Sequence, residues 1–364
     1  MKHFIRIFVV SIFIFTLTSF ARAQDAATKA EFDCLTMATR TSSVALPQDP
    51  ARSPAFHHVW TPGLSYGTFK SNGIELLYET EGNGSEVVIV VHGGAGLPHE
   101  YFHPMLSNLS RYAKIVYFDR RADMLSANTK HDFATISEMA DDIDALRQAL
   151  GLNRVTLFGH SFGATIAMNY ALRYPANVKR LILVAAGPSI ENPSEAEKRI
   201  VKTFTATERA NYQANEGVQG ATNACERVRR RYSVLYPKYF FKQVPYESDR
   251  GVYTVYFDAL VKKIALSNDP SGFDVRAQLN QIKAPVLVVA GRYDLVTPLE
   301  QSSELAEGLP TSRLVVMDHS GHFPFFEENY LFTEWVRRFI AATSDATDDR
   351  KMSGPITAST SGSR

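Results

Sequence analysis

The sequence has little cysteine and no excess charge. Only two cysteines, Cys34 and Cys225, occur among 364 residues, too few for a disulfide-dense scaffold or a cysteine-rich metal cluster. The 39 basic and 38 acidic side chains leave a net charge of +1, which provides no broad basic surface for nucleic acid. Beyond residue 23, no stretch is long and apolar enough to span a bilayer. These shortages indicate an ordinary globular protein with no nucleic-acid partner.

The first 23 residues are typical of a secretory signal peptide. Lys2 and Arg6 precede an apolar run, and Ala21-Arg22-Ala23 supplies a small-x-small cleavage pattern. We therefore expect cleavage after Ala23, a secreted or periplasmic protein, and no stable membrane association after cleavage. The alternative is a retained membrane anchor. In an exported protein the two cysteines could form a disulfide, but the sequence cannot decide whether they do.

Short apolar strands alternate with amphipathic helices in two separated stretches. This alternation predicts an α/β fold with a mostly parallel sheet and helices on both faces. A helical insertion between the two stretches would form a cap over the carboxyl ends of the strands, where ligands bind in such folds. The expected divisions are a signal peptide (1–23), an N-terminal extension (24–64), a core (65–187 and 282–342), the cap (188–281) and a disordered tail (343–364). A single helix over 324–340 would close the core.

The central motif is Gly159-His160-Ser161-Phe162-Gly163. A β-prone segment, 154–158, precedes it, and a helical pattern, 164–173, follows it. In this strand, turn and helix context, G-x-S-x-G is typical of a nucleophile elbow. The glycines leave room in the tight turn, and the helix N-terminus below the serine favours negative charge. Ser161 is therefore the predicted nucleophile.

A serine nucleophile needs a base and a group that orients the base. The best base is His322, in a loop after the last strand, and the best orienting acid is Asp294, at the end of the preceding strand. The order Ser161, Asp294, His322 is the chain order of this kind of triad. His319 is the rival base, and Asp318 is a weaker candidate for the acid.

The tetrahedral intermediate of acyl transfer needs backbone N–H donors for its oxyanion. Phe162, which follows the nucleophile, is expected to supply one. Gly94, in the glycine loop after the strand ending at Val91, is expected to supply the other. His92 and Gly93 are expected to support that loop and to take no part in the chemistry.

One stretch matches the pattern of a zinc-binding motif. His99-Glu100-Tyr101-Phe102-His103 matches the zincin pattern H-E-x-x-H, which requires one continuous helix. Pro104 follows immediately and disfavours the helical conformation at His103. We therefore predict no metal and no other cofactor.

These motifs together resemble the α/β-hydrolase superfamily over residues 65–342. The loop His92-Gly93-Gly94-Ala95-Gly96 further resembles the His-Gly-Gly-Pro-Gly loop of the proline iminopeptidases. The chain departs from that family at Ala95 and at His160 and Phe162 in the elbow, where the family usually has Gly-Gly-Ser-Trp-Gly. It also departs at residues 119–123, where Asp-Arg-Arg-Ala-Asp replaces Asp-Gln-x-Gly. The resemblance implies a cap carboxylate that holds the substrate amine, and the nearest candidates are Glu216 and Glu226.

The sequence thus predicts an exported serine hydrolase that forms an acyl-enzyme on Ser161 with a small-molecule or short peptide substrate. Release of N-terminal aminoacyl groups is the favoured reaction. A carboxylesterase or lactonase acting on a small apolar acyl group is the alternative, and a non-catalytic binding protein on the same fold is a third. The sequence leaves the oligomeric state open.

Overall fold

The structure is a computed structural model. It describes residues 64–94, 99–103, 105–121, 135–191, 193–216, 233–242 and 274–343. The signal peptide, nearly all of the N-terminal extension and of the tail, both cysteines and Glu226 lie outside the described residues.

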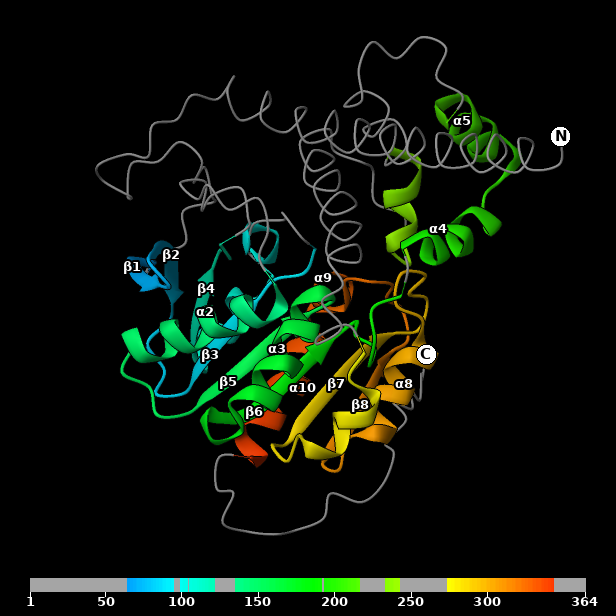
Figure 1. The fold of residues 1–364 in the computed structure, drawn as a ribbon. Coiled ribbons are helices and arrows are strands. Elements are labelled where there is room, and N and C mark those ends of the chain that lie inside the picture. The colour runs from blue at the N-terminus through cyan, green and yellow to red at the C-terminus, as the bar shows by residue number, and fades with distance from the viewer. Residues whose placement is uncertain are drawn as a thin grey trace, which may run out of the picture.

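The described strands form one eight-stranded sheet in the order β1-β2-β4-β3-β5-β6-β7-β8 (Figure 1). Strands β3 to β8 pair in parallel, and the β1-β2 hairpin lies antiparallel at one edge. Asn72 and Gly73 both have positive φ, at 49° and 80°, which suits the tight turn between these two strands. The strands are β1 (Ser65–Ser71), β2 (Ile74–Glu81), β3 (Val87–Val91), β4 (Lys114–Phe118), β5 (Val155–His160), β6 (Val178–Val184), β7 (Val286–Gly291) and β8 (Ser312–Met317).

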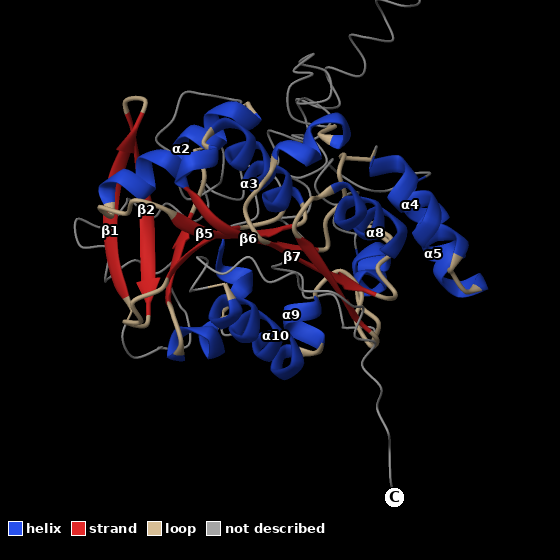
Figure 2. Cartoon of the chain, turned by 90° about the horizontal axis from the view of Figure 1, so that it is seen from below, coloured by secondary structure: helices blue, strands red, loops and turns tan. Residues whose placement is uncertain are grey.

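Helices cover both faces of the sheet. Figure 2 shows α2 and α3 on one side and α9 and α10 on the other. The chain leaves the carboxyl end of β6 toward α4 and α5, which lie beyond the strand ends in Figure 1. The α-helices are α2 (Ile136–Ala149), α3 (Phe162–Arg173), α4 (Pro193–Lys202), α5 (Ala206–Glu216), α8 (Leu299–Gly308), α9 (Pro324–Glu327) and α10 (Asn329–Ala342). The short 3₁₀ helices are η3 (His99–Phe102), η4 (Ser107–Arg111), η6 (Pro175–Asn177), η7 (Tyr236–Tyr239) and η8 (Arg276–Gln281).

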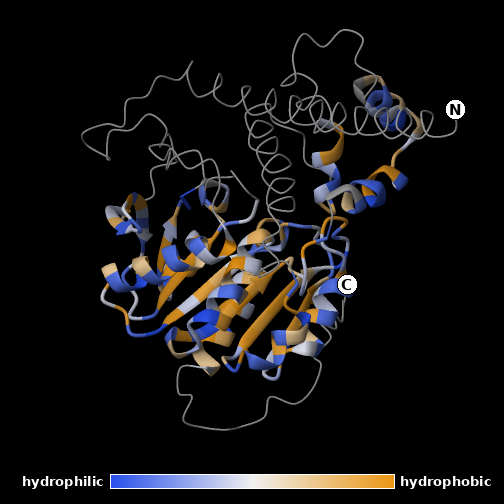
Figure 3. Ribbon diagram, in the orientation of Figure 1, coloured by the Kyte–Doolittle hydropathy of each residue, from blue (hydrophilic) through white to orange (hydrophobic). Residues whose placement is uncertain are grey.

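Each face of the sheet has its own apolar core. Alternate residues of β5 point to opposite faces, so Leu157 packs with α2 and α3, whereas Phe158 packs with α9 and α10. Apolar residues concentrate in the central strands and polar residues on the outer helix surfaces (Figure 3). Such strands, buried on both faces, are typical of parallel sheets. No helix in the described part of the chain is long and apolar enough to cross a membrane.

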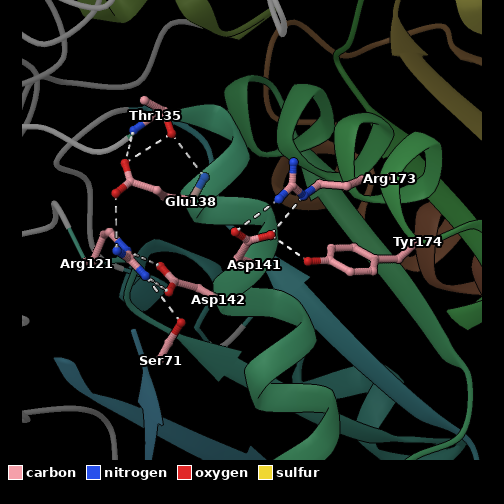
Figure 4. A network of polar contacts seen from close by, with 8 residues as sticks. All are labelled: Ser71, Arg121, Thr135, Glu138, Asp141, Asp142, Arg173 and Tyr174. Atoms are coloured by element: carbon pink, nitrogen blue, oxygen red, sulfur yellow. Dashed lines mark hydrogen bonds and ion pairs between the residues drawn. The ribbon is translucent and has the colours of Figure 1, made fainter. Parts of the chain in front are cut away.

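A polar network ties the end of β4 to α2 (Figure 4). Arg121 donates from Nε to Asp142 Oδ2 at 2.9 Å and from Nη2 to Ser71 Oγ at 3.2 Å. Burial raises the pKa of Asp142, an effect that the hydrogen bonds from Arg121 and Ser71 oppose. Thr135 and Glu138 form a capping box at the start of α2.

The predicted closing helix, 324–340, is wrong in one respect, because it is broken at Glu328 into α9 and α10. The break has a physical reason. Glu328 leaves the helical conformation, and its Oε2 accepts hydrogen bonds from the His319 N–H at 2.9 Å and from Ser320 Oγ at 2.7 Å. A continuous helix would lose this attachment to the loop that contains His322.

Candidate active site

Ser161 lies in a strained turn between β5 and α3. Its φ is 52° and its ψ is −121°, a conformation that L-residues rarely adopt. A Cβ atom at Gly163 would collide with the backbone oxygens of Val91 and His92, and one at Gly159 would collide with the backbone of α3. The two glycines are therefore required for space, as the sequence predicted. The Ser161 N–H donates to the Val184 carbonyl at 2.8 Å, which fixes the turn against β6.

The structure brings His322 and Asp294 together. His322 Nδ1 lies 2.8 Å from Asp294 Oδ2, and both side chains are buried. Asp294 Oδ1 accepts the N–H groups of Val296 and Thr297 at 2.8 and 2.9 Å. Because both carboxylate oxygens are engaged, the carboxylate has one orientation. A proton on His322 Nδ1 leaves Nε2 as the nitrogen that could act as a base.

His322 lies next to the nucleophile turn. Its ring packs against the ring of His160, the neighbour of Ser161, with the ring centroids 4.9 Å apart. Its N–H donates to the Tyr239 carbonyl at 2.6 Å, so the segment 233–242 helps to hold it.

Glu327 connects the loop that contains His322 to the segment 233–242. One carboxylate oxygen accepts the Gly321 N–H at 2.7 Å, and the other accepts the Phe241 N–H at 2.7 Å. Burial raises the pKa of this carboxyl, whereas the hydrogen bonds from the backbone N–H groups oppose that shift. The loop that contains the predicted base, His322, is therefore anchored by α9 as well as by Asp294.

A directed chain of hydrogen bonds links the glycine loop to the base. Burial, with a contribution from His322, holds the pKa of His160 well below its ordinary value, so His160 is neutral. His160 Nε2–H donates to the His322 carbonyl at 2.9 Å, which leaves Nδ1 to accept from the Tyr101 hydroxyl at 2.8 Å. The Tyr101 oxygen accepts the Gly93 N–H at 2.6 Å. Because the Gly93 N–H is used in this way, it is not available to an oxyanion, which agrees with the choice of Gly94 as the predicted donor.

Arg120 is one of the side chains at this site that sequence reasoning missed. It is completely buried, and its Nη2 donates to the Gly94 carbonyl oxygen and lies 3.2 Å from His92 Nδ1. Its guanidinium also lies 5.3 Å from the centre of the Phe162 ring, which favours a cation–π interaction. One arginine thus contacts the two residues whose N–H groups were predicted to form the oxyanion hole.

A family model described as the alpha/beta hydrolase fold matches residues 86–329, more than half of the chain. The chain belongs to the α/β-hydrolase family.

Individual members of this family show more distant similarity. A protein of Agrobacterium fabrum, named provisionally as the carbamate hydrolase RutD, is 29% identical over 256 residues, 69% of this chain and 92% of its own length. The proline iminopeptidase of Saccharolobus solfataricus is 27% identical over 289 residues, 72% of this chain and 87% of its own length. The crystal structure of VinJ has a TM-score of 0.62 at 21% identity, over 77% of this chain and 99% of its own. The last comparison shows the shared fold alone.

In this α/β-hydrolase, a cavity opens beside Ser161. Its volume is about 820 Å³ with its open mouth included. The lining is mainly apolar and comes from the elbow, from α4, from the segment 233–242 and from the loops that follow β6 and β7. Its larger apolar members include Phe162, Ile190, Ile200, Leu235 and Val296.

Two carboxylates line this cavity, and neither was predicted. Arg199 pairs with Glu191, with Nη1 to Oε1 at 2.9 Å. Glu197, on α4, accepts a hydrogen bond from the hydroxyl of Tyr212. The two predicted carboxylates cannot be compared with them, because the side chain of Glu216 and all of Glu226 lie outside the described residues.

The rival residues of the triad lie at the surface. The side chain of His319 is 67% exposed, and Asp318 forms an exposed ion pair with Arg292. The sequence ranked His322 and Asp294 above them, and in the structure these two are the pair that is buried and hydrogen-bonded.

Proposed function

We propose that the protein is a serine hydrolase that forms an acyl-enzyme on Ser161. The observation that carries the proposal is the pairing of a strained serine at a helix N-terminus with a buried, carboxylate-oriented histidine in the adjoining loop. In the first half-reaction, Ser161 Oγ attacks the substrate carbonyl while His322 Nε2 accepts its proton. The N–H groups of Gly94 and Phe162 stabilise the oxyanion.

Departure of the leaving group completes the first half-reaction, and attack by water begins the second. His322 gives its proton to the leaving group as the carbonyl to leaving-group bond breaks. Water then attacks the acyl-enzyme, His322 accepts a proton from that water, and Ser161 regains its own proton as the acid product leaves. Asp294 stabilises the imidazolium in both halves and keeps its tautomer fixed.

The substrate class that we propose is an N-terminal aminoacyl compound, with Glu197 as the group that binds the amine. A buried substrate ammonium needs a compensating charge. Both Glu191 and Glu197 line the cavity, and we choose Glu197 because it lies on a helix of the predicted cap, α4, where the resemblance to proline iminopeptidases implies an amine-binding carboxylate. The resemblance to proline iminopeptidases, and the 27% identity to one of them, support this substrate class.

A pair of substrates tests the proposal. An aminoacyl-naphthylamide with a free amine should be cleaved faster than its N-acetylated twin. Glu197→Gln should lower kcat/KM for the free amine by about 10-fold or more and leave the acetylated compound unaffected, because a charged hydrogen bond contributes roughly 1.5–3 kcal/mol. Glu195→Gln is the matched control, since Glu195 is an exposed residue of the same helix, paired with Lys198. Equal rates on both substrates would refute the amine-binding role while leaving the serine mechanism intact.

The second candidate is an ester or lactone hydrolase. The predominantly apolar lining of the cavity favours it, because a small apolar acyl group would fit there without a charged partner. A panel of p-nitrophenyl esters assayed beside the naphthylamides separates the two candidates.

A further inference from the structure

Three side chains with metal-binding atoms converge near one edge of the sheet. Glu79 lies on β2, His99 begins η3, and His103 follows it. Glu79 Oε1 lies 2.5 Å from His103 Nε2 and 3.2 Å from His99 Nε2. One potential ligand atom from each of the three side chains lies within 4.8 Å of the other two.

The groups around these three side chains are those that orient metal ligands. Asp119 Oδ1 lies 3.0 Å from His99 Nδ1 and accepts the His99 backbone N–H at 3.0 Å. This contact holds the ring with Nε2 toward Glu79. Metal-binding histidines usually donate their second ring N–H to a carboxylate in this way. Glu81 Oε2 lies near the second ring nitrogen of His103, 3.9 Å from Nδ1, which is beyond hydrogen-bond distance.

Three buried carboxylates surround these histidines and need nearby positive charge, which a bound cation or protonated imidazoles would supply. Glu79, Glu81 and Asp119 are 1%, 3% and 2% exposed. Hydroxyl groups of Ser107 and Tyr117 donate to Glu81, at 3.0 and 3.3 Å, but they bring no charge. Burying several carboxylates together is costly unless cations are close. Glu79 Oε2 is also buried and has no hydrogen-bond partner among the described residues.

We propose that Glu79, His99 and His103 bind one divalent ion of the zinc class. Two imidazoles and a carboxylate are a ligand set that zinc favours. Ligands of a tetrahedral zinc ion lie about 3.3 Å apart, given metal–ligand distances of about 2.0–2.1 Å. The 3.2 Å separation already fits, and the 2.5 Å separation requires an outward shift of less than about 1 Å.

The metal at this site is structural. It joins β2 to the segment that follows the glycine loop, and it is not part of a zincin helix, because η3 contains only four residues and is a 3₁₀ helix. Hydrolysis through Ser161 therefore does not require the ion, and the proposal stands or falls independently of the proposed function.

Metal binding to the untagged full-length protein tests this directly. After removal of metals with a chelator and dialysis against Zn²⁺ or Co²⁺, elemental analysis should find one ion per chain. The Co²⁺ form should show the intense visible absorption of a tetrahedral site. Zn²⁺ at about 100 times its Kd should raise the Tm by about 5 °C.

Variants assign the ion to these residues. His103→Gln and Glu79→Gln should abolish stoichiometric binding, and Asp119→Asn should weaken it by about 10- to 100-fold. His319→Ala, which removes an exposed imidazole, should leave it unchanged. The proposal is wrong if the wild-type protein binds neither ion or gains no stability from Zn²⁺. Protonated histidines would then hold the cluster together. Binding that survives in both ligand variants also overturns the proposal.

Discussion

Replacement of Arg120 by methionine should damage catalysis much more than substrate binding. Methionine keeps most of the length of the side chain but removes the donor to the Gly94 carbonyl and the cation beside the Phe162 ring. Loss of a complete oxyanion donor costs about 100- to 1,000-fold in kcat. In this variant the N–H donors of Gly94 and Phe162 remain, and only the contacts from Arg120 that position them are lost. We therefore expect kcat to fall by about 10- to 100-fold.

Stability should fall in the same variant. A hydrogen bond to a charged group contributes about 1.5–3 kcal/mol, and a desolvated cation–π contact adds about 1 kcal/mol. The free energy of unfolding should therefore decrease by about 3 kcal/mol, which urea unfolding measures.

Steady-state kinetics on one substrate provide the assay, with KM expected to change less than threefold. The matched control is Arg313→Met, because Arg313 also lies over an aromatic ring, that of Trp335 at 4.6 Å, but on β8. The control should keep its kcat. A variant of Arg120 with normal kcat and a raised KM would refute the reasoning, since it would place the arginine in substrate binding.

Two further predictions concern single histidines, and a third concerns export. His322→Ala should reduce kcat by several orders of magnitude while His319→Ala changes it little, and the reverse ranking would reassign the base. Burial keeps the pKa of His160 well below its ordinary value of roughly 6.5, so below about pH 6.5 the unfolded chain gains a proton that the folded protein does not bind. The free energy of unfolding should then fall with decreasing pH, by up to about 1.4 kcal/mol per pH unit. Urea unfolding should show a weaker pH dependence for His160→Gln, which has no imidazole at this position. Export with cleavage after Ala23 should give a mature N-terminus at Gln24 by mass spectrometry, whereas an intact Met1 on membrane-bound protein would indicate an anchor.

The sequence predicted those parts of the fold that depend on local patterns. Continuous apolar runs such as β3 indicate strands buried on both faces, and the capping box at Thr135 marks the start of α2. The break at Glu328 was not predictable, because it depends on contacts with His319 and Ser320 that exist only in the folded chain.

The sequence likewise predicted some residues of the candidate site and missed others. Ser161 lies in a motif whose spacing specifies its turn, and chain order pointed to Asp294 and His322. Arg120 stood in a stretch that differs from the iminopeptidase pattern, and that departure was the available signal for it. Its burial beneath Gly94 depends on how β3 and β4 pair, which no local pattern specifies.

The most direct test of the central claim is labelling with a fluorophosphonate, which reacts with activated serine nucleophiles. Intact-mass analysis followed by peptide mapping should find one adduct per chain, on Ser161. The Ser161→Ala variant should remain folded by circular dichroism and take up no label. An unlabelled wild-type protein, or a variant labelled as strongly as the wild type, would contradict the claim that Ser161 is the nucleophile.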